Sequence, residues 1–366
     1  MMTSSGPIRR VALLTSGGDA PGLNAVIRAF VKTARLEFGW DVYGVEDGFE
    51  GLIGKPKIRP LDLSDVRGLL PMGGTILGST NKGHFSSFEI VEGRRVHDPA
   101  ALNAVCETVR KLRIDGLVVL GGEGSQAIAL DLYENGVPTV GVPKTIDNDL
   151  GGTDMTFGFH TALWVATDAI DRLHSTAASH DRVMVLEVMG RHAGWIALYA
   201  GIGGGADVIL IPEIPFTFEA VADKILEREA HGTEFSIIVV AEGATPAGGT
   251  AVYQSEHEKR LGGIGQSVAE EVQRRTGKET RVVVLGHLQR GGSPTPSDRV
   301  LATRFGVAAA KAIAERKFGQ MVALRCGQLT TVPLREVAGI VRGVPVDSDL
   351  ISTARALGIS MGDERG

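Results

Sequence analysis

Short runs of β-branched and aliphatic residues recur along the first part of the chain, each followed by a glycine-rich stretch and then by a longer mixed stretch. In the first of these units, the apolar run at residues 11–14 precedes a glycine-rich stretch at residues 17–22. The segment from Asn24 to Thr33 follows, and its apolar residues are spaced so that they share one helical face. This order of strand, turn and helix is typical of a parallel sheet with helical connections.

Two further units repeat the order. Residues 116–120 form an apolar run before the glycines of residues 121–125, and a helix is expected from Ala127 onwards. The run at residues 139–142 leads directly into Pro143, Lys144 and residues 145–149. Because the loops that follow parallel strands gather at the carboxyl edge of the sheet, we expect the three loops to face one crevice at a topological switch point.

A second set of elements begins at about Phe157. It predicts a further α/β layer system, because apolar strand-like runs again alternate with segments of helical spacing. The expected helices are residues 161–174 and 304–313, and the expected strands are residues 183–188, 208–211, 236–240 and 282–285.

Length and composition restrict the class of protein. A chain of 366 residues is longer than a single hydrophobic core usually serves, so two domains are expected. The net charge is −5, with no long block of Lys or Arg, which argues against a nucleic-acid partner. The apolar runs are too short for a membrane span, so we expect a cytoplasmic protein with no membrane partner. The spacing of cysteines and histidines indicates no zinc site, and we expect Trp164 and Trp195 in the core.

The two glycine-rich turns are candidates for phosphate binding. In Gly17-Gly18-Asp19 and in residues 121–125, the missing side chains let backbone N–H groups approach phosphate oxygens at a helix N-terminus. A single turn of this kind is equally compatible with plain tight-turn geometry. Two of them, each with an acidic residue in or beside the glycines, favour a phosphate site, although neither is a Walker sequence.

Residues 145–149, Thr-Ile-Asp-Asn-Asp, contain two carboxylates two positions apart, which point the same way if the backbone is extended. One carboxylate then accepts a proton from an attacking hydroxyl while the other holds Mg²⁺, as phosphoryl transfer requires. A turn rich in Asp and Asn with solvated carboxylates is the alternative, and it stays open at this point. Further phosphate contacts are expected from a set of cations at or beyond apolar strands: Arg182, Arg191, Arg281, His287 and Arg290.

Six motifs resemble those of the phosphofructokinase family and occur in the same order as in the family. The resemblance covers nearly the whole chain. The motifs begin at Thr15 (TSGGDAPGLN), Gly74 (GTILGS), Gly121 (GGEGS), Pro143 (PKTIDND), Glu187 (EVMGR) and Val284 (VLGHLQRGG). The resemblance implies transfer of a phosphoryl group to the 1-hydroxyl of fructose 6-phosphate, giving fructose 1,6-bisphosphate in glycolysis.

The resemblance also implies the architecture. It predicts two Rossmann-like α/β/α domains with mainly parallel sheets and the active site in the cleft between them. Residues 1–158 with 289–341 are expected to form the larger, donor-binding domain. Residues 159–288 with 342–366 are expected to form the smaller domain, which binds the sugar phosphate.

Site residues follow from the same resemblance. The resemblance implies that Asp147 is the general base and that Thr145 and Asp149 help to place the substrate and the metal. It also implies that Arg191 stabilises the transferring phosphoryl group. The sugar-phosphate site is completed by Met189, Gly190, Glu242, His287 and Arg290, and by Arg182 and Arg281 from a neighbouring subunit, which implies a homotetramer or at least a homodimer. The donor site is Gly18, Gly122, Glu123, Gly124, Ser125 and Lys144, with Mg²⁺ held by Glu123 and Asp149.

The phosphoryl donor depends on two of these positions. Relatives that use ATP usually have Gly at both, whereas relatives that use pyrophosphate usually have Asp and Lys, and this chain has Gly124 and Lys144. An Asp at position 124 would repel the α-phosphate of ATP, whereas Lys144 favours any phosphate. A similar pairing, also with Glu in the first loop, occurs in the actinobacterial-type ATP-dependent or mixed-substrate branch. ATP is therefore the predicted donor, with pyrophosphate as the alternative.

Two alternatives of another class are a non-catalytic sugar-phosphate sensor and an NAD-binding oxidoreductase. The intact Asp147, Asp149 and Arg191 argue against the sensor, and the missing Gly-x-Gly-x-x-Gly argues against the oxidoreductase. The chain also departs from the family where relatives commonly carry Arg after the Gly74 motif. Here Thr80, Asn81 and Lys82 follow, so any cation expected there is Lys82.

Overall fold

The computed structural model describes residues 6–80, 83–91, 94–250, 253–255 and 260–363. The chain forms two compact units. The first unit consists of Met1–Ile146, Leu150–Thr161 and Arg290–Val341, and the second unit of Asp147–Asp149, Ala162–Gln289 and Arg342–Gly366. Which unit binds the phosphoryl donor and which binds the sugar phosphate stays a prediction.

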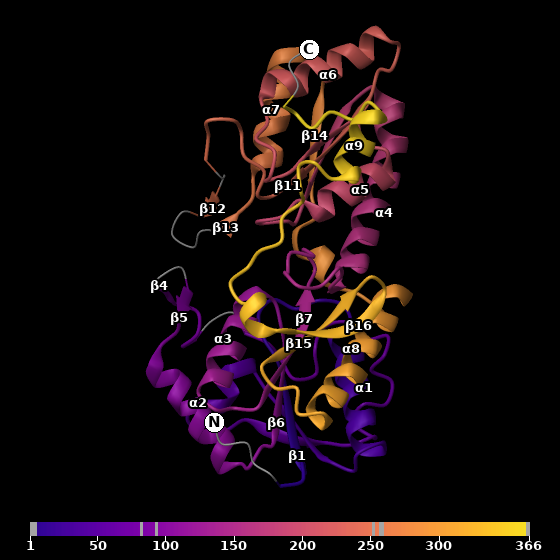
Figure 1. Cartoon of the computed structure of the whole chain (residues 1–366). Helices are drawn as coiled ribbons and strands as arrows, with labels where there is room; N and C mark the ends of the chain where they lie inside the picture. Colours follow the sequence, from indigo (N-terminus) through magenta and orange to yellow (C-terminus); the bar gives the residue numbers. More distant parts are fainter. Residues whose placement is uncertain (1–5, 81–82, 92–93, 251–252, 256–259, 364–366) are drawn as a thin grey trace. The chain divides into compact units, whose positions relative to one another are not determined.

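The first unit is built on a mainly parallel sheet (Figure 1). Its strands in spatial order are β16 (Gln328–Pro333), β15 (Gln320–Arg325), β7 (Thr139–Thr145), β6 (Gly116–Gly121), β1 (Arg10–Thr15), β2 (Asp41–Val45) and β3 (Ile58–Leu61), and β8 (Phe157–Gly158) pairs with β7. Only β3 and β16 pair antiparallel with their neighbours in this sheet. The chain leaves β1 for β2 on one side and later returns to β6 on the other, so the switch point lies between β1 and β6.

Helices cover both faces of this sheet. The helices of the first unit are α1 (Leu23–Leu36), α2 (Pro99–Lys111), α3 (Glu123–Glu134) and α8 (Pro296–Ala314), with 3-10 turns η1 (Gly48–Leu52) and η3 (Leu334–Glu336) and a small hairpin of β4 (Glu89–Val91) and β5 (Arg94–Val96).

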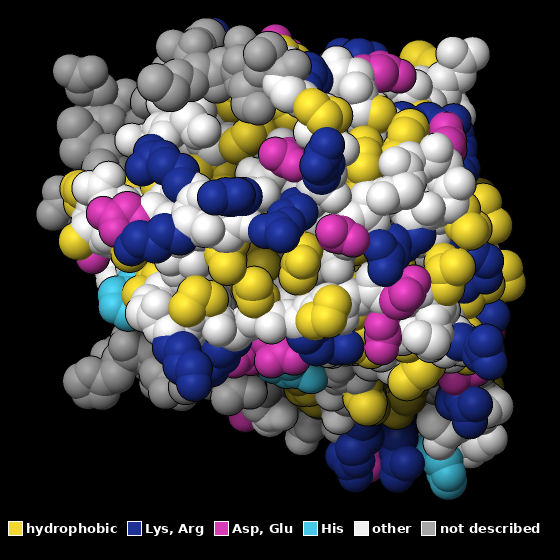
Figure 2. Space-filling model, turned by 90° about the horizontal axis from the view of Figure 1, so that it is seen from below, with side chains coloured by type: hydrophobic (Ala, Val, Ile, Leu, Met, Phe, Trp, Pro, Cys, Tyr) yellow, Lys and Arg dark blue, Asp and Glu magenta, His cyan; other side chains and the backbone are white. Residues whose placement is uncertain are grey.

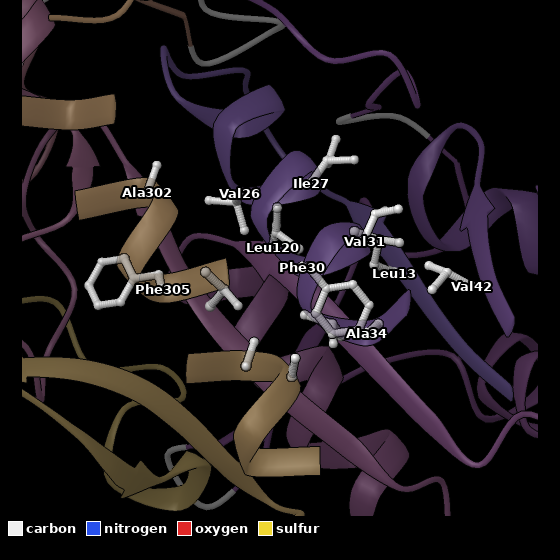
Figure 3. Close-up of a cluster of buried hydrophobic side chains, with 14 of the residues drawn as sticks. Leu13, Val26, Ile27, Phe30, Val31, Ala34, Val42, Leu120, Ala302 and Phe305 are labelled. Carbon is white, nitrogen blue, oxygen red and sulfur yellow. The ribbon is translucent and has the colours of Figure 1, made fainter. Parts of the chain in front are cut away.

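Successive residues of β1 point to opposite faces and so enter two different cores. Leu13 belongs to a cluster with α1 and α8, in which Phe30 and Phe305 are fully buried (Figure 3). Leu14 belongs to another cluster, with α2 and α3. The first unit is therefore a three-layer α/β/α structure.

The second unit has a parallel sheet of its own. The strands in spatial order are β10 (Val208–Leu210), β11 (Ser236–Ala241), β9 (Val183–Val188) and β14 (Thr280–Val284); the helices are α4 (Phe159–His180, which begins in the first unit), α5 (Trp195–Gly204), α6 (Phe218–Ala230), α7 (Ile264–Thr276) and α9 (Asp349–Ala356), with the 3-10 turn η2 (Gly286–Arg290) and a hairpin of β12 (Tyr253–Ser255) and β13 (Arg260–Leu261). Both α6 and α7 pack on one face of this sheet, and α5 packs on β10 and β11. The prediction of an α/β fold with two mainly parallel sheets is confirmed.

The predicted elements are present, but several begin earlier or extend further than expected. Helix α8 begins at Pro296 and not at residue 304, because Thr295 Oγ1 accepts a hydrogen bond from the Asp298 N–H and proline suits the first helical position. Helix α3 begins at Glu123 and not at Ala127, so the second glycine turn contains the first turn of the helix.

Trp195 is buried as predicted, but the prediction that Trp164 lies in the core is wrong, since Trp164 is 61% exposed. In α4, Ala162, Ala166 and Ile170 form the buried stripe. Trp164 is two positions beyond Ala162, which places it on the opposite side of the helix.

The face shown in Figure 2 carries Lys and Arg side chains interspersed with Asp and Glu, and hydrophobic side chains lie between them. Such a mixture is ordinary for a water-facing protein surface. Among the described residues, no helix is both long and apolar enough to cross a membrane.

Candidate functional site

The first glycine turn follows β1 and is held by hydrogen bonds from hydroxyl groups. Thr15 Oγ1 donates to the Gly78 carbonyl at 2.5 Å, and Ser79 Oγ donates to the Gly17 carbonyl at 2.5 Å. Gly17 has φ 79°, a left-handed conformation that favours glycine. The motif that begins at Gly74 therefore supports the turn, a role that its sequence did not predict.

The second glycine turn follows β6 and leads directly into α3. A Cβ atom on Gly121 would lie 2.1 Å from the Cβ of Ser125, so only glycine is compatible with this close approach. Ser125 Oγ donates to Ser16 Oγ at 3.0 Å, which joins the two turns. The expectation that these two turns meet at the switch point is confirmed.

Residues 123–125 form the first turn of α3. The N–H groups there have no partner within the helix itself, and the helix dipole adds positive potential, so this end of the helix suits an anion. Gln126, which the sequence analysis did not single out, is fully buried. Its Nε2 donates to the carbonyls of Gly121 at 3.0 Å and Val142 at 3.1 Å, which ties the ends of β6 and β7 together.

Two cations of the first unit bind the backbone of the first turn. Lys144 on β7 is only 4% exposed, and its Nζ donates to the Gly18 carbonyl. Arg290 Nη1 donates to the Asp19 carbonyl at 3.0 Å. A Cβ on Gly18 would lie 2.9 Å from Arg290 Nη1, so the guanidinium occupies the space that a side chain would need. Lys144 thereby ties the end of β7 to the first turn.

A cavity of about 280 Å³ in the first unit opens beside both turns. It is lined by Gly17 and Gly124 of the turns and by the rings of Phe85, Phe88 and His97. The His97 ring is 6.0 Å from the ring of Phe85 and is held by Asp131, whose Oδ2 lies 2.8 Å from His97 Nδ1. A lining of glycine turns together with aromatic rings suits a ligand with both phosphate and a flat ring. The sequence analysis missed this aromatic wall, because the phenylalanines lie in an irregular segment without periodicity.

Thr80 also lines this cavity. Asn81 and Lys82 lie outside the described residues, so the prediction that Lys82 supplies a cation here stays a prediction.

The carboxylate run Asp147–Asp149 belongs to the second unit. The premise of an extended backbone is wrong, since Ile146 and Asp147 form a bend and Asn148 has φ 52°. Asn tolerates this left-handed conformation better than most residues, and Asn148 is buried. Both carboxylate residues are partly exposed. Thr145, the last residue of β7, lies in the first unit, and its carbonyl accepts a hydrogen bond from Thr156 Oγ1 at 2.7 Å.

Three neighbouring strands of the second unit bring several predicted sugar-phosphate residues to one edge. Met189, Gly190 and Arg191 follow β9, Glu242 follows β11, and His287 follows β14. The Glu242 N–H donates to the Val188 carbonyl at 2.8 Å. The buried Gln289, another residue that the sequence analysis gave no role, accepts a hydrogen bond from the Met189 N–H through Oε1 at 2.7 Å. It thereby ties the end of β9 to η2.

Arg182 and Arg281 lie elsewhere in the second unit. Arg182 precedes β9, and Arg281 pairs in register with Met184 near the start of that strand. Both form ion pairs with Glu279, Arg182 at 2.9 Å, and the hydrogen bond from Arg182 is the main reason why the pKa of Glu279 falls below its ordinary value. The structure thus separates these arginines from residues 189–191 by the length of β9, roughly 20 Å at about 3.3 Å per residue.

No cluster of three or more His, Cys, Asp or Glu side chains suited to a metal ion is present in the part of the chain that the structure describes. Glu123, the first residue of α3, is partly exposed beside the second turn, and Asp149 is partly exposed in the second unit. Carboxylate oxygens are suitable ligands for Mg²⁺, which commonly takes one or two carboxylates together with substrate phosphates and water.

Comparisons with known proteins agree with this picture. The sequence model of the family described as phosphofructokinase matches residues 10–313. A Chloroflexus aggregans protein named ATP-dependent 6-phosphofructokinase is 61% identical over 97% of this chain and 98% of its own. A Synechocystis protein named ATP-dependent 6-phosphofructokinase 1 is 49% identical over 98% of this chain and 100% of its own.

Among solved structures, a chain of Pichia pastoris phosphofructokinase in the T-state has a TM-score of 0.80 and is 32% identical, covering 98% of this chain and 38% of the Pichia chain. The resemblance therefore extends from the motifs to the complete fold. Membership of the actinobacterial-type branch stays a prediction.

Proposed function

Because the chain belongs to the phosphofructokinase family, we propose that it transfers the terminal phosphoryl group of ATP to the 1-hydroxyl of fructose 6-phosphate, a reaction of glycolysis. The relatives at 61% and 49% identity both carry names that specify ATP. The observation that carries the proposal is the cavity in which two joined glycine turns meet an aromatic wall. Pyrophosphate has no ring to occupy such a wall, whereas ATP has both a ring and phosphates.

The first unit is proposed to bind the donor. Gly18, Gly122, Gly124 and Ser125 present backbone N–H groups to the phosphates. Lys144 donates to the Gly18 carbonyl, so its ammonium group supports the shape of the turn and is not reserved for pyrophosphate. This contact explains how a lysine at this position is compatible with ATP.

The second unit is proposed to supply the chemistry at the acceptor. Asp147 accepts the proton of the 1-hydroxyl as that oxygen attacks the terminal phosphorus of ATP, and ADP leaves. Arg191 stabilises the negative charge on the transferring group. The sugar phosphate is bound by Met189, Gly190, Glu242, His287 and Arg290, with Thr145 and Asp149 beside the reacting hydroxyl.

Glu123 and Asp149 would hold Mg²⁺, for which their partly exposed carboxylates are suitable ligands. When bound, the ion neutralises charge on the phosphates of the donor.

We also propose that the protein forms a homotetramer or homodimer, in which Arg182 and Arg281 serve the sugar-phosphate site of a neighbouring subunit. Their position at the opposite end of β9 from Arg191 supports this assignment. β14 is an edge strand of its sheet, and Val284 on it and Leu288 just beyond it are 50% and 68% exposed. A cytoplasmic location is proposed because both substrates are intracellular metabolites.

The donor is tested by assaying the purified protein with fructose 6-phosphate and either ATP or pyrophosphate, each with Mg²⁺. Product formation with ATP is expected. Activity with pyrophosphate alone would establish the alternative donor. Binding of fructose 6-phosphate without turnover on either donor would indicate the sugar-phosphate sensor.

The role of Asp147 is tested by Asp147→Ser, which is expected to lower kcat roughly 10²- to 10⁴-fold while fructose 6-phosphate still binds. Asp171→Ser, on an exposed position of α4, is the matched control and should keep full turnover. Near-normal turnover of the Asp147→Ser enzyme would exclude Asp147 as the base.

A further inference from the structure

One residue of the second unit binds two successive carbonyl groups of the carboxylate run. The backbone N–H of Arg342 donates to the Asp149 carbonyl at 2.7 Å. Its guanidinium donates to the Asn148 carbonyl, from Nη2 at 2.8 Å and from Nε at 3.3 Å. The sequence analysis assigned no role to Arg342, which is nearly 200 positions further along the chain, 194 from Asn148.

Arg342 is itself fixed by Trp195, the first residue of α5. The indole Nε1 of Trp195 donates to the Arg342 carbonyl at 2.9 Å. The carbon at the centre of the guanidinium lies 4.8 Å from the centre of the Trp195 ring, within the range of a cation–π contact. Trp195 is only 8% exposed and provides a rigid surface for the arginine.

A partly exposed carboxylate secures the adjoining backbone. Glu213 accepts hydrogen bonds from the Val344 N–H at 2.7 Å and from the Gly194 N–H at 3.0 Å. Glu213 thus joins the segment after Arg342 to the residue before Trp195. The backbone beside Arg342 and the backbone beside Trp195 are therefore both bound to Glu213, which restricts the positions of these two residues.

The left-handed conformation of Asn148 requires contacts that hold it, and Arg342 provides them. A residue other than glycine at φ 52° costs about 1–2 kcal/mol, and such a conformation persists only where its surroundings enforce it. The hydrogen bonds of Arg342 to the carbonyls of residues 148 and 149 fix the two peptide planes on either side of Asp149, one between residues 148 and 149 and one between residues 149 and 150. Rotation of the plane between residues 148 and 149 would turn the carboxylates of Asp147 and Asp149 relative to one another.

We propose that Arg342 is a positioning residue for phosphoryl transfer, which holds the Asp147–Asp149 backbone in the conformation that aims the Asp147 carboxylate; this rests on the proposed role of Asp147 as base. Arginine suits the task because its planar guanidinium donates two N–H groups to one carbonyl while its face lies on an aromatic ring. Lysine has the positive charge, but it lacks the paired N–H donors and the planar face of the guanidinium group.

Arg342→Met tests the proposal. We expect kcat to fall about 10- to 100-fold, because a misplacement of about 1 Å can cost 10²-fold in rate. The KM for ATP should stay within about twofold, because the residues proposed to bind the donor belong to the first unit. Arg304→Met is the matched control, since Arg304 Nη2 also donates to a backbone carbonyl, that of Gly327 at 3.0 Å, and should leave kcat unchanged.

A double-mutant cycle separates positioning of the base from general stability. In an enzyme that already carries Asp147→Ser, Arg342→Met should produce no further loss of kcat. An equal loss in both backgrounds, or unchanged kcat in the single variant, would overturn the proposal. If Asp147→Ser itself retains normal turnover, the proposed role of Asp147 as base is wrong, and this outcome is distinct from a failure of the positioning role of Arg342.

Two milder variants keep the test decisive if Arg342→Met does not fold. Trp195→Phe keeps a ring under the guanidinium but removes the N–H that binds the Arg342 carbonyl, and Arg342→Lys keeps the charge. Each should lower kcat several-fold in the enzyme with Asp147 and have no effect beside Asp147→Ser. Equal losses in the two backgrounds would again contradict the proposal.

Discussion

The glycine turns of the first unit and the carboxylate run of the second unit are organised in opposite ways. At Gly18 and Gly121 an added Cβ would lie within 3.0 Å of an existing atom, so the turns depend on atoms that are missing. The run Asp147–Asp149 depends on atoms that are present: two carboxylates, a left-handed asparagine and an arginine that binds two carbonyls.

This difference agrees with the role proposed for each region. Phosphate groups of a donor are recognised by backbone N–H groups, which reach them only where side chains are absent. A proton and a developing charge require ionisable side chains at defined positions. Adding atoms should therefore damage the first region, whereas removing atoms should damage the second.

The largest expected effect of an added group is at Gly124, which lines the cavity beside the second turn. Gly124→Asp should lower kcat/KM for ATP about 10²- to 10³-fold, because a carboxylate about 4 Å from a phosphate charge is strongly repelled. The KM for fructose 6-phosphate should change little. Steady-state assays with each substrate varied in turn measure both effects.

Gly124→Asn controls for volume without charge and should lose much less activity with ATP. If the two variants lose equal activity, crowding and not charge controls the choice of donor. A gain of activity with pyrophosphate in the Asp variant would show that the charge at position 124 selects the phosphoryl donor.

The two regions also differ in how far the sequence predicted them. A strand, a glycine turn and a helix N-terminus are adjacent in the chain, so the two glycine turns and their meeting at the switch point were predictable from local pattern. The conformation of the carboxylate run was left open between an extended segment and a turn rich in Asp and Asn, and the structure shows a bend with a left-handed Asn148. This conformation depends on Arg342, which no local pattern connects to Asn148.

Other residues missed by the sequence analysis share this origin. Gln126 and Gln289 bind carbonyl and N–H groups that pairing of the strands brings to them, up to 100 positions away. The aromatic wall of the cavity includes Phe85 and Phe88 from an irregular segment. Trp164 was misplaced because its neighbours in sequence are apolar, whereas only the 3.6-residue helical repeat determines which side of α4 is buried.

A smaller effect is expected where an aromatic ring is removed from the cavity. Phe88→Ala should raise the KM for ATP about tenfold, because stacking of a base on an aromatic side chain contributes about 1–3 kcal/mol. The KM for fructose 6-phosphate should be unchanged. Leu36→Ala, which removes a side chain of the same unit that is 67% exposed, is the control. An unchanged KM for ATP in Phe88→Ala would mean that this ring does not contact the donor.

A still smaller effect is expected from the backbone of the carboxylate run. Asn148→Ala and Asn148→Gly both remove the side-chain amide, but only glycine adopts φ 52° without strain. The alanine variant should be less stable than the glycine variant by about 1 kcal/mol. Urea unfolding of the two proteins measures the difference, and equal stabilities would show that the left-handed conformation is not retained in solution.

The smallest effect is expected from an ion pair at the edge of the cavity. Glu50 lines the cavity, and its Oε2 lies 2.8 Å from His84 Nδ1. This hydrogen bond, with the negative charge of Glu50, raises the pKa of His84 above its ordinary value of 6.5. Because the pKa is raised on folding, the stabilising contribution is fully present below pH 6.5 and is lost as the pH rises through the folded-state value.

Above that pH the charge of Glu50 is no longer compensated beside the proposed phosphate site. The KM for ATP should then rise with pH by no more than about threefold, since both groups are partly or largely exposed. Glu50→Gln should abolish this rise and return the pKa of His84 towards 6.5, which an NMR titration of the His84 ring measures directly. A His84 pKa that is unaffected by Glu50→Gln would contradict the pairing. Loss of the pH effect on ATP, without any change at the acceptor, would place this ion pair with the donor turns and not with the carboxylate run.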